Sequence, residues 1–531
     1  RARCQTGCGG VTRELVVAVD AGTSVIKALA FDMQGHQLAA ASRPNLYETG
    51  VGGAVEQDMA RTWTDTVAVL RELGERVDGL LDRAAVLAIT GQGDGTWLVD
   101  EAGEPVAPGW LWLDSRAAGI VEEFEASGVR RAIYRHTGCG LNACNQSAQM
   151  VWMQRNSKTV LDRTASAHHC KDWLYLRLTG RRATDVTEGT FTFGDFRTRR
   201  YVPEIPEQLG IAAYRRLLPE MVDGTRQTHP LSAAAAAATG LRAGLPVSLG
   251  AVDVVCTALG AGLYEPGRAV GCSIIGSTGM HMNFVPDAIR HELAPEPGGY
   301  TMPFPVPGTV AQMQSNMAAT LNIDWIVDAG REAAGILGLD VGRADALAAF
   351  DARVLKAEPG AVLFHPYILE AGERGPFVNA AARAQFTGLT SRAGFVDLVR
   401  GVYEGLALAA RDCYAAMGRL PEEIRVAGGA ARSKALRQLL ASALGVPVRE
   451  STREEAGAAG AAMMAAVAIG AFSDMASAVA KWVAPTLRDT VQPDPSLKAL
   501  YDRLFPVYVK ARQAMPPVWA ALAAARRGSI Q

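Results

Sequence analysis

Apolar runs and short turns alternate along the first hundred residues. Three β-rich runs within residues 15–43 are separated by the turns DAGTS and MQGH, which is typical of an antiparallel β-meander. Apolar positions then recur every three or four residues over 58–81, which predicts an amphipathic helix, and AAVLAIT at 84–90 predicts a buried strand. This alternation indicates an α/β fold in which helices cover a sheet.

A second set of elements begins near the middle of the chain. An Ala-rich helix and a Gly/Pro break place a domain boundary near Leu245, so we expect domains over 14–245 and 246–480, a disordered extension over 1–13 and a helical extension over 481–531. The segment RAVGCSIIGSTGMHMNFVPD pairs two apolar runs around a Gly-Ser-Thr-Gly turn. Its similarity to the DAGTS segment predicts an internal structural duplication. The Ala-rich run over 458–472 predicts a buried helix.

Composition narrows the class of protein. A chain of 531 residues is too long to form a single hydrophobic core, so we expect two domains. Its net charge is −1, and nothing in it suggests the basic stripe that would bind nucleic acid or an anionic membrane. The longest apolar run is too short to span a bilayer. The eight cysteines are scattered, and Cys4 and Cys8 form a single C-x3-C without the second ligand pair that a structural zinc needs. We expect a cytoplasmic protein with a small-molecule partner; a homodimer is left open.

Three glycine turns follow apolar strands: DAGTS, GSTG and AGGAARS. Such turns present backbone N–H groups to an oxyanion, and the third also opens a helix, whose N-terminus favours phosphate. Two hairpin turns at equivalent places of two half-chains can hold a triphosphate from both sides. Asp20 is a candidate ligand for a hydrated Mg²⁺, with a turn cap as the alternative. The candidate nucleotide-binding residues are Asp20, Gly22, Thr23, Ser24, Lys27, Gly276, Ser277, Thr278, Gly428, Gly429, Ala430 and Ser433.

The motifs DAGTSVIK, SIIGSTG, VAGGA and AGAAGAA, together with KDWLYLRLTG and TDVTEGTFT, resemble those of the FGGY carbohydrate kinases, members of the actin-like, ribonuclease-H-like ATPase superfamily. The resemblance implies two such domains with an active-site cleft between them, closing around ATP, Mg²⁺ and a small sugar or polyol. It implies a catalytic base at Asp253, which can also hold Mg²⁺ through water, and a nucleotide contact at Thr320. The alternative role for Asp253 is a helix N-cap.

The acceptor-binding positions of the family fall after VLAITG and in WLWLDSRA, which implies substrate contacts by Gln92, Asp94, Trp112, Asp114 and Asp253. Asp94 can instead be a plain turn residue and Trp112 a core tryptophan, and Asp114 can pair with Arg116 to order the pocket wall. Glycerol kinases carry Arg-Glu and xylulose kinases Met-His where this chain has Gly93 and Asp94. We expect that change to enlarge the pocket and to disfavour glycerol and D-xylulose.

The combination GQGDGTWL, LWLDSRA, HCKDWLY, GTFTFGDFRTRRY and IIGSTGMH is most similar to the erythritol kinases of this family, and less so to its L-xylulose kinases. This resemblance implies ATP-dependent phosphorylation of a terminal hydroxyl of erythritol. The alternatives are a kinase for L-xylulose, another ketopentose or a pentitol, and a non-catalytic actin-like ATPase module.

Overall fold

The computed structural model describes residues 13–527, so Cys4, Cys8 and nearly all of the expected extension over 1–13 lie outside the described residues. The chain forms two compact units. Unit 1 holds the described residues up to Gly260 with Met302–Gly308 and Glu455–Trp482; unit 2 holds Ala261–Thr301, Thr309–Glu454 and the described residues from Val483 onward. No helix of the described part is long and apolar enough to cross a membrane.

Unit 1 is built on a six-stranded sheet in the order β14-β15-β6-β1-β2-β3. Its strands are β1 (Leu15–Ala21), β2 (Val25–Asp32), β3 (Gln37–Pro44), β6 (Ala84–Gly91), β14 (His229–Pro230) and β15 (Pro246–Leu249). The first three form the predicted antiparallel meander, whereas β1, β6 and β15 are parallel. The predicted boundary near Leu245 is therefore wrong, because the Gly/Pro break there leads into β15 of the same sheet.

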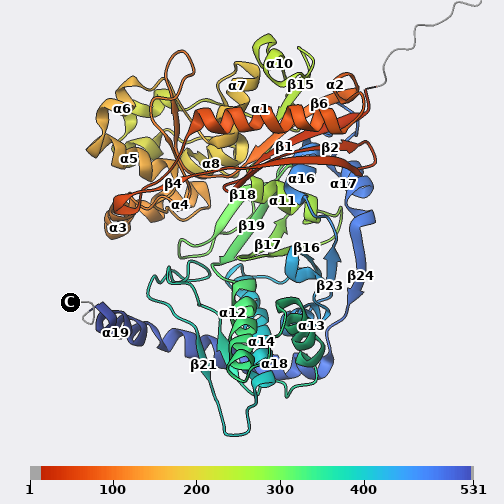
Figure 1. Cartoon of the computed structure of the whole chain (residues 1–531). Helices are drawn as coiled ribbons and strands as arrows, with labels where there is room; N and C mark the ends of the chain where they lie inside the picture. The colour runs from red at the N-terminus through yellow and green to blue at the C-terminus, as the bar shows by residue number, and fades with distance from the viewer. Residues whose placement is uncertain (1–12, 528–531) are drawn as a thin grey trace, which may run out of the picture. The chain divides into compact units, whose positions relative to one another are not determined.

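Helices cover both faces of this sheet. Leu15, Val17 and Val19 share a core with residues of α1 (Met59–Arg76), α7 (Cys170–Thr179) and α10 (Ala233–Thr239). The buried helix α16 (Ala456–Ala468) contacts β1, β6 and β15, and it is the predicted Ala-rich buried helix. Figure 1 shows α1 running along the strands β1 and β2. The predicted helix over 58–81 ends at Arg76, and the short α2 (Leu80–Arg83) follows it.

A second core of unit 1 lies in the elements inserted between β6 and β15. Besides α7, β14 and α10, that segment contains β7 (Trp97–Val99), β8 (Gly109–Trp110), α3 (Ala118–Ala126), α4 (Val129–Thr137), α5 (Gln146–Asn156), α6 (Lys158–Arg163), β9 (Ser166–His168), β10 (Ala183–Asp185), α8 (Val186–Phe193), β11 (Gly194–Asp195), β12 (Arg200–Tyr201), α9 (Glu204–Gln208), the short 3-10 helix over Ala212–Leu217 and β13 (Glu220–Val222). Of these, β10 and β13 contribute Ala183 and Val222 to the first core.

Unit 2 repeats the topology of unit 1. Its seven-stranded sheet has the order β18-β19-β17-β16-β22-β23-β24, with β16 (Val270–Ile275), β17 (Gly279–Val285), β18 (Tyr300–Pro303), β19 (Val310–Asn316), β22 (Glu423–Ala427), β23 (Val448–Ser451) and β24 (Leu487–Val491). The strands β16, β17 and β19 form an antiparallel meander, and β16, β22 and β23 are parallel. Each unit therefore has the same five-strand core, and the predicted duplication is confirmed.

Helices of unit 2 pack on one core: α12 (Thr320–Ile336), α13 (Arg343–Val354), α14 (Phe395–Ala416), α15 (Lys434–Leu444) and α18 (Pro495–Ala514). The buried Tyr501 and Tyr508 bring α18 into this core. The predicted extension over 481–531 is helical in α18 and α19 (Pro516–Arg527), but β24 within it pairs with β23. This segment therefore completes unit 2.

Candidate active site

Three acidic residues of unit 1 lie at or just after the carboxyl ends of the parallel strands β1, β6 and β15. Asp20 is the penultimate residue of β1 and pairs with Thr90 of β6; Asp94 follows β6, and Asp253 begins α11 (Asp253–Ala261) after β15. The carboxyl ends of parallel strands meet at one edge of a sheet, which is where α/β proteins bind ligands. The fold therefore gathers three acids, far apart in sequence, at one edge of unit 1.

Asp20 lies where the start of α16 approaches β1. A Cβ at Gly457 would lie 2.8 Å from Asp20 Oδ2, so only glycine permits this approach. Burial raises the pKa of Asp20 to about 6, although the nearby Lys27 acts in the opposite direction. The Lys27 ammonium is 2.8 Å from Glu455 Oε2. Lys27 is therefore paired with the carboxylate of Glu455, a residue that the sequence did not indicate as part of the site.

Asp253 is the first residue of α11, directly after Val252. The Val252 carbonyl accepts hydrogen bonds from the N–H groups of Val255 and Cys256. Burial, followed by the charge of Asp20, raises the pKa of Asp253 to about 8. Such a strongly perturbed buried acid is typical of a functional group.

The residues at this edge fit a divalent cation. Among residues 13–527, no group of three or more His, Cys, Asp or Glu side chains is arranged to hold a metal. Mg²⁺, however, uses few protein ligands and keeps several waters. A cation near Asp20 and Asp253 would relieve the repulsion that raises the pKa of Asp253.

The DAGTS turn is held by side chains from elsewhere in unit 1. The Asn45 amide donates to Gly22 O over 2.8 Å, and the Gln57 amide donates to Thr23 O over 3.3 Å. Trp112 is only partly buried, and its Nε1–H donates to Thr23 Oγ1 over 2.7 Å, which disfavours the alternative of a core tryptophan. Neither Asn45 nor Gln57 could be selected from the sequence, since single polar residues outside any motif carry no spacing signal.

Gln92 and Asp114 make structural hydrogen bonds. The Gln92 amide donates to Gln57 Oε1 over 2.8 Å. The buried Asp114 accepts from the Val55 N–H over 2.9 Å and from the Arg116 guanidinium over 2.6 Å. Of the two roles considered for Asp114, this geometry favours ordering of the wall that carries Trp112.

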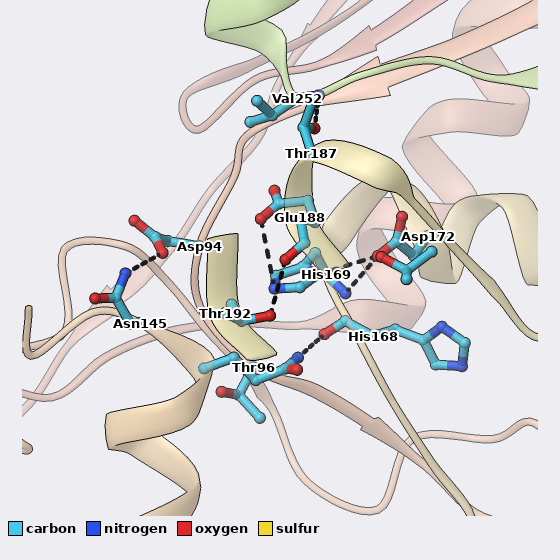
Figure 2. Close-up of polar contacts among 12 residues, drawn as sticks. Asp94, Thr96, Asn145, His168, His169, Asp172, Thr187, Glu188, Thr192 and Val252 are labelled. Atoms are coloured by element: carbon cyan, nitrogen blue, oxygen red, sulfur yellow. Dashed lines mark hydrogen bonds and ion pairs between the residues drawn. The ribbon is translucent and has the colours of Figure 1, made fainter. Parts of the chain in front are cut away.

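Asp94 has a left-handed backbone conformation, with φ of 59°, as expected for a turn between two glycines. Its Oδ1 accepts a hydrogen bond from the Asn145 amide over 2.7 Å, and Cys144 Sγ lies 3.5 Å from Oδ2. Figure 2 shows Asn145 pointing at the Asp94 carboxylate. Asn145, in the polar run NACNQ over 142–146, therefore orients Asp94.

Gly93 does not open space, contrary to the prediction. A Cβ at this position would lie 2.3 Å from Val252 Cγ2 and 2.8 Å from Glu188 Oε1. Both side chains fill the volume that a longer residue at position 93 would take. The expected enlargement of the pocket is therefore wrong, because a valine and a carboxylate from other elements occupy that volume.

Glu188 belongs to a cluster of buried charges around the first turns of α7 and α8. Its Oε2 is 3.5 Å from His169 Nε2, and His169 Nδ1 is 3.0 Å from Asp172. Lys171 contacts Asp172 over 2.7 Å and Asp185 over 2.6 Å. Burial raises the pKa of Glu188 to about 7, against the opposing charges of His169 and Lys171. Glu188 lies in the segment TDVTEGTFT, but no role for it could be predicted from the sequence.

In unit 2 the GSTG turn connects β16 to β17, as DAGTS connects β1 to β2. The Gly276 N–H donates to Thr278 O over 3.0 Å, and Ser277 and Thr278 are exposed. The Thr320 N–H donates to Gly276 O over 3.0 Å, which brings the start of α12 to this turn. His281 of β17 is buried, and both of its ring nitrogens are engaged within unit 2, Nδ1 with the Ser273 hydroxyl over 2.9 Å and Nε2 with Asn316 Oδ1 over 3.0 Å.

The AGGAARS turn follows β22 of unit 2. Gly428 has a φ of 92°, and a Cβ there would lie 2.6 Å from Ile275 O, whereas a Cβ at Gly429 would meet open space. Ala430 is buried and begins to turn the chain toward α15. Ser433 caps that helix by accepting from the Leu436 N–H over 3.0 Å. Gly428 and Ser433 therefore shape the turn, and Gly429 is its open position.

Two ribonuclease-H-like units with glycine hairpin turns define a two-domain ATPase of the actin-like class. The chain belongs to the FGGY family of carbohydrate kinases: residues 15–260 match the N-terminal domain of that family and residues 272–469 its C-terminal domain. The first match ends where unit 1 passes into unit 2.

Relatives from several organisms resemble this chain over most of its length. It is 53% identical to an erythritol kinase from Brucella abortus (strain 2308), over 97% of this chain and 98% of that protein. It is 28% identical to a xylulose kinase from Escherichia coli (strain K12), over 86% of this chain and 90% of that protein. The structure of a xylulose kinase from Rhodospirillum rubrum superimposes with a TM-score of 0.85 at 26% identity, covering 95% of this chain and all of that one.

Proposed function

We propose that the protein transfers the γ-phosphoryl group of ATP to a terminal hydroxyl of erythritol. The observation that carries this proposal is the 53% identity to an erythritol kinase over nearly the full length of both chains. The acids of unit 1 support it, because carboxylates accept hydrogen bonds from the hydroxyls of a polyol. ATP is the phosphoryl donor that the family implies.

Phosphoryl transfer depends mainly on positioning and on charge stabilisation. We propose that Asp253 accepts the proton of the attacking hydroxyl group. The oxygen of that hydroxyl bonds to the γ-phosphorus while the bond between the γ-phosphorus and the β,γ-bridging oxygen breaks, with ADP as the leaving group. Asp94, oriented by Asn145, accepts hydrogen bonds from the other hydroxyls, and Trp112 packs beside the carbon chain. When bound near Asp20 and Asp253, Mg²⁺ would neutralise charge on the phosphates.

We propose that unit 2 binds the nucleotide. The exposed Ser277 and Thr278 offer hydroxyl and N–H donors to phosphate, and Thr320 lies beside their turn. The turn at Gly428 and Gly429 is the proposed contact for adenosine, since Gly429 leaves the backbone uncovered. On unit 1, Gly22, Thr23 and Ser24 would supply the second set of phosphate donors.

A panel of acceptors tests the proposal. Turnover and kcat/KM are measured with ATP and Mg²⁺ for erythritol, threitol, ribitol, xylitol, glycerol, L-xylulose and D-xylulose. We expect erythritol to have the highest kcat/KM. A ketopentose that exceeded erythritol tenfold would make the protein a ketopentose kinase, and steady ATP hydrolysis unaffected by every acceptor would exclude a carbohydrate kinase.

A further inference from the structure

Two threonine hydroxyls hold the same peptide group just before Asp253. Thr90 of β6 donates its hydroxyl hydrogen to Ala251 O over 2.7 Å, and Thr187 of α8 accepts from the Val252 N–H over 3.0 Å. The carbonyl and the N–H concerned belong to the one peptide bond between Ala251 and Val252. Both threonine side chains are buried.

The Thr187 hydroxyl is committed to accepting this bond. Its single hydrogen is donated to Asp185 Oδ2 over 2.6 Å, which leaves an oxygen lone pair for the Val252 N–H. Asp185 is itself held by Lys171 over 2.6 Å. Figure 2 shows the Thr187 hydroxyl directed at the backbone of Val252. A buried chain of ionic and hydrogen-bonding groups thus ends at the backbone that precedes Asp253.

A trans peptide group is planar, and its C=O and N–H point in opposite directions. Bonds at both ends therefore fix how this plane is rotated about the chain. The Val252 carbonyl is also fixed, because it accepts the first N–H groups of α11. The Asp253 side chain projects from the next residue, so its direction depends on these bonds.

We propose that Thr90 and Thr187 are positioning residues for Asp253, acting through the peptide group between Ala251 and Val252. This inference rests on the proposed function, in which Asp253 accepts the proton of the acceptor. Thr187 is the more important of the two. The Val252 N–H donates to the Thr187 hydroxyl, whereas Ala251 O accepts from the Cys256 thiol over 3.3 Å as well as from Thr90.

The test compares Thr187→Val, Thr187→Ser and Thr90→Val by steady-state kinetics. Valine keeps the shape of threonine but cannot accept the Val252 N–H. We expect Thr187→Val to lower kcat ten- to a hundredfold, the effect of a displacement of about 1 Å, while KM for ATP and for the acceptor changes less than threefold. Serine restores the acceptor and should return kcat to within about threefold of wild type. Thr90→Val should lower kcat by a smaller factor.

Thr192→Val is the matched control, because the Thr192 hydroxyl is buried in the same helix and bonds Glu188 O over 2.8 Å, away from Val252. We expect wild-type kcat from it. The proposal is overturned if Thr187→Val keeps wild-type kcat, if serine fails to restore it, or if Thr192→Val loses as much activity. Should Thr187→Val fail to fold, Thr187→Cys replaces it, since a thiol is a weak acceptor of similar size; wild-type kcat there also overturns the proposal.

The acceptor panel distinguishes a failure of the proposed function from a failure of the positioning role of Thr187. A wild-type protein that phosphorylates no sugar or polyol contradicts the proposed function. A wild-type protein that is active, with a fully active Thr187→Val variant, contradicts only the positioning role.

Discussion

The two units share one strand order, but the turns at the ends of their strands carry different chemistry. In unit 1 the strands β1, β6 and β15 lead to Asp20, Asp94 and Asp253. In unit 2 the turns after the equivalent strands β16 and β22 are GSTG and GGAAR, which contain no acid, whereas β23, the equivalent of β15, is followed by Glu454 and Glu455. Aligning Gly22 with Gly276 places Ile274 where unit 1 has Asp20.

This difference matches the two substrates of a carbohydrate kinase. Carboxylates attract hydroxyls and cations and repel phosphate, whereas neutral N–H and O–H donors attract phosphate. A duplicated scaffold can thus provide one unit for the acceptor and another for most of the nucleotide, with further phosphate donors in the DAGTS turn of unit 1. The assignment is testable, because changes at equivalent turns of the two units should affect different substrates.

The largest expected effect is that of Asp253→Asn. Asparagine keeps the size of the side chain but cannot accept the hydroxyl proton, so turnover should fall about a hundredfold or more. The affinities for ATP and erythritol should change little. Steady-state kinetics with isothermal titration calorimetry of each substrate measures both.

Turnover of Asp253→Asn within threefold of wild type would remove Asp253 from the role of base. If ATP and erythritol both failed to bind to the folded variant, the acid would instead be required for the architecture of the site.

Alanine at the two glycine turns after β6 and β22 should separate the substrates. In Gly428→Ala the added Cβ would lie 2.6 Å from Ile275 O at a φ of 92°, so the turn must move, and KM for ATP should rise tenfold or more. In Gly93→Ala the Cβ would meet Val252 and Glu188. That change should raise KM for erythritol by about tenfold and leave KM for ATP unchanged.

Gly429→Ala is the folding control for the pair, since its Cβ would meet no protein atom within 4 Å and its φ is not positive; because it adds a Cβ at the proposed adenosine contact, its KM for ATP is not a control value. It should fold with wild-type stability. The contrast between the units fails if Gly93→Ala and Gly428→Ala raise the same KM.

Replacing Asp94 should mainly weaken acceptor binding. In Asp94→Ala the loss of a carboxylate that accepts hydroxyls should raise KM for erythritol about tenfold, the effect of one charge-assisted hydrogen bond. Asp94→Gly separates the carboxylate from the turn, because glycine adopts the φ of 59° without strain. If Asp94→Gly retained wild-type KM for erythritol, Asp94 would be a turn residue only.

The sequence predicted most of the strands, the buried helix and the duplication of the fold, but fewer of the side-chain contacts around the candidate site. Strand alternation and the repeated glycine turns predicted the meanders, the duplication and the buried α16, since these depend on local periodicity. The boundary near Leu245 was wrong because a turn within a sheet and a linker between domains have the same local composition. Gly93 was misinterpreted because its neighbours, Glu188 and Val252, are distant in sequence. Only the fold shows that they fill the space beside it.

The last expected effect is on stability and not on turnover, again at Asp253. Its pKa is about 8 in the folded protein and 3.8 by its ordinary value. Between these pH values the folded state binds more protons than the unfolded state, so the Asp253 contribution destabilises the protein increasingly as pH rises from about 4 to about 8. Asparagine has no such dependence. Each pH unit between these two values contributes about 1.4 kcal/mol, so Asp253→Asn should match wild type near pH 4 and be more stable by several kcal/mol at pH 8.

Thermal unfolding without nucleotide or Mg²⁺, from pH 4 to pH 9, measures this difference. Added Mg²⁺ should raise the Tm of the wild-type protein more than that of Asp253→Asn, because the ion offsets the charge that asparagine lacks. A constant Tm difference across the pH range would mean that Asp253 is not destabilised by its burial and by Asp20. In that case the carboxylates of Asp20 and Asp253 would not repel each other, and the acids of unit 1 would lack the electrostatic coupling that the turns GSTG and GGAAR of unit 2, which contain no acid, cannot have.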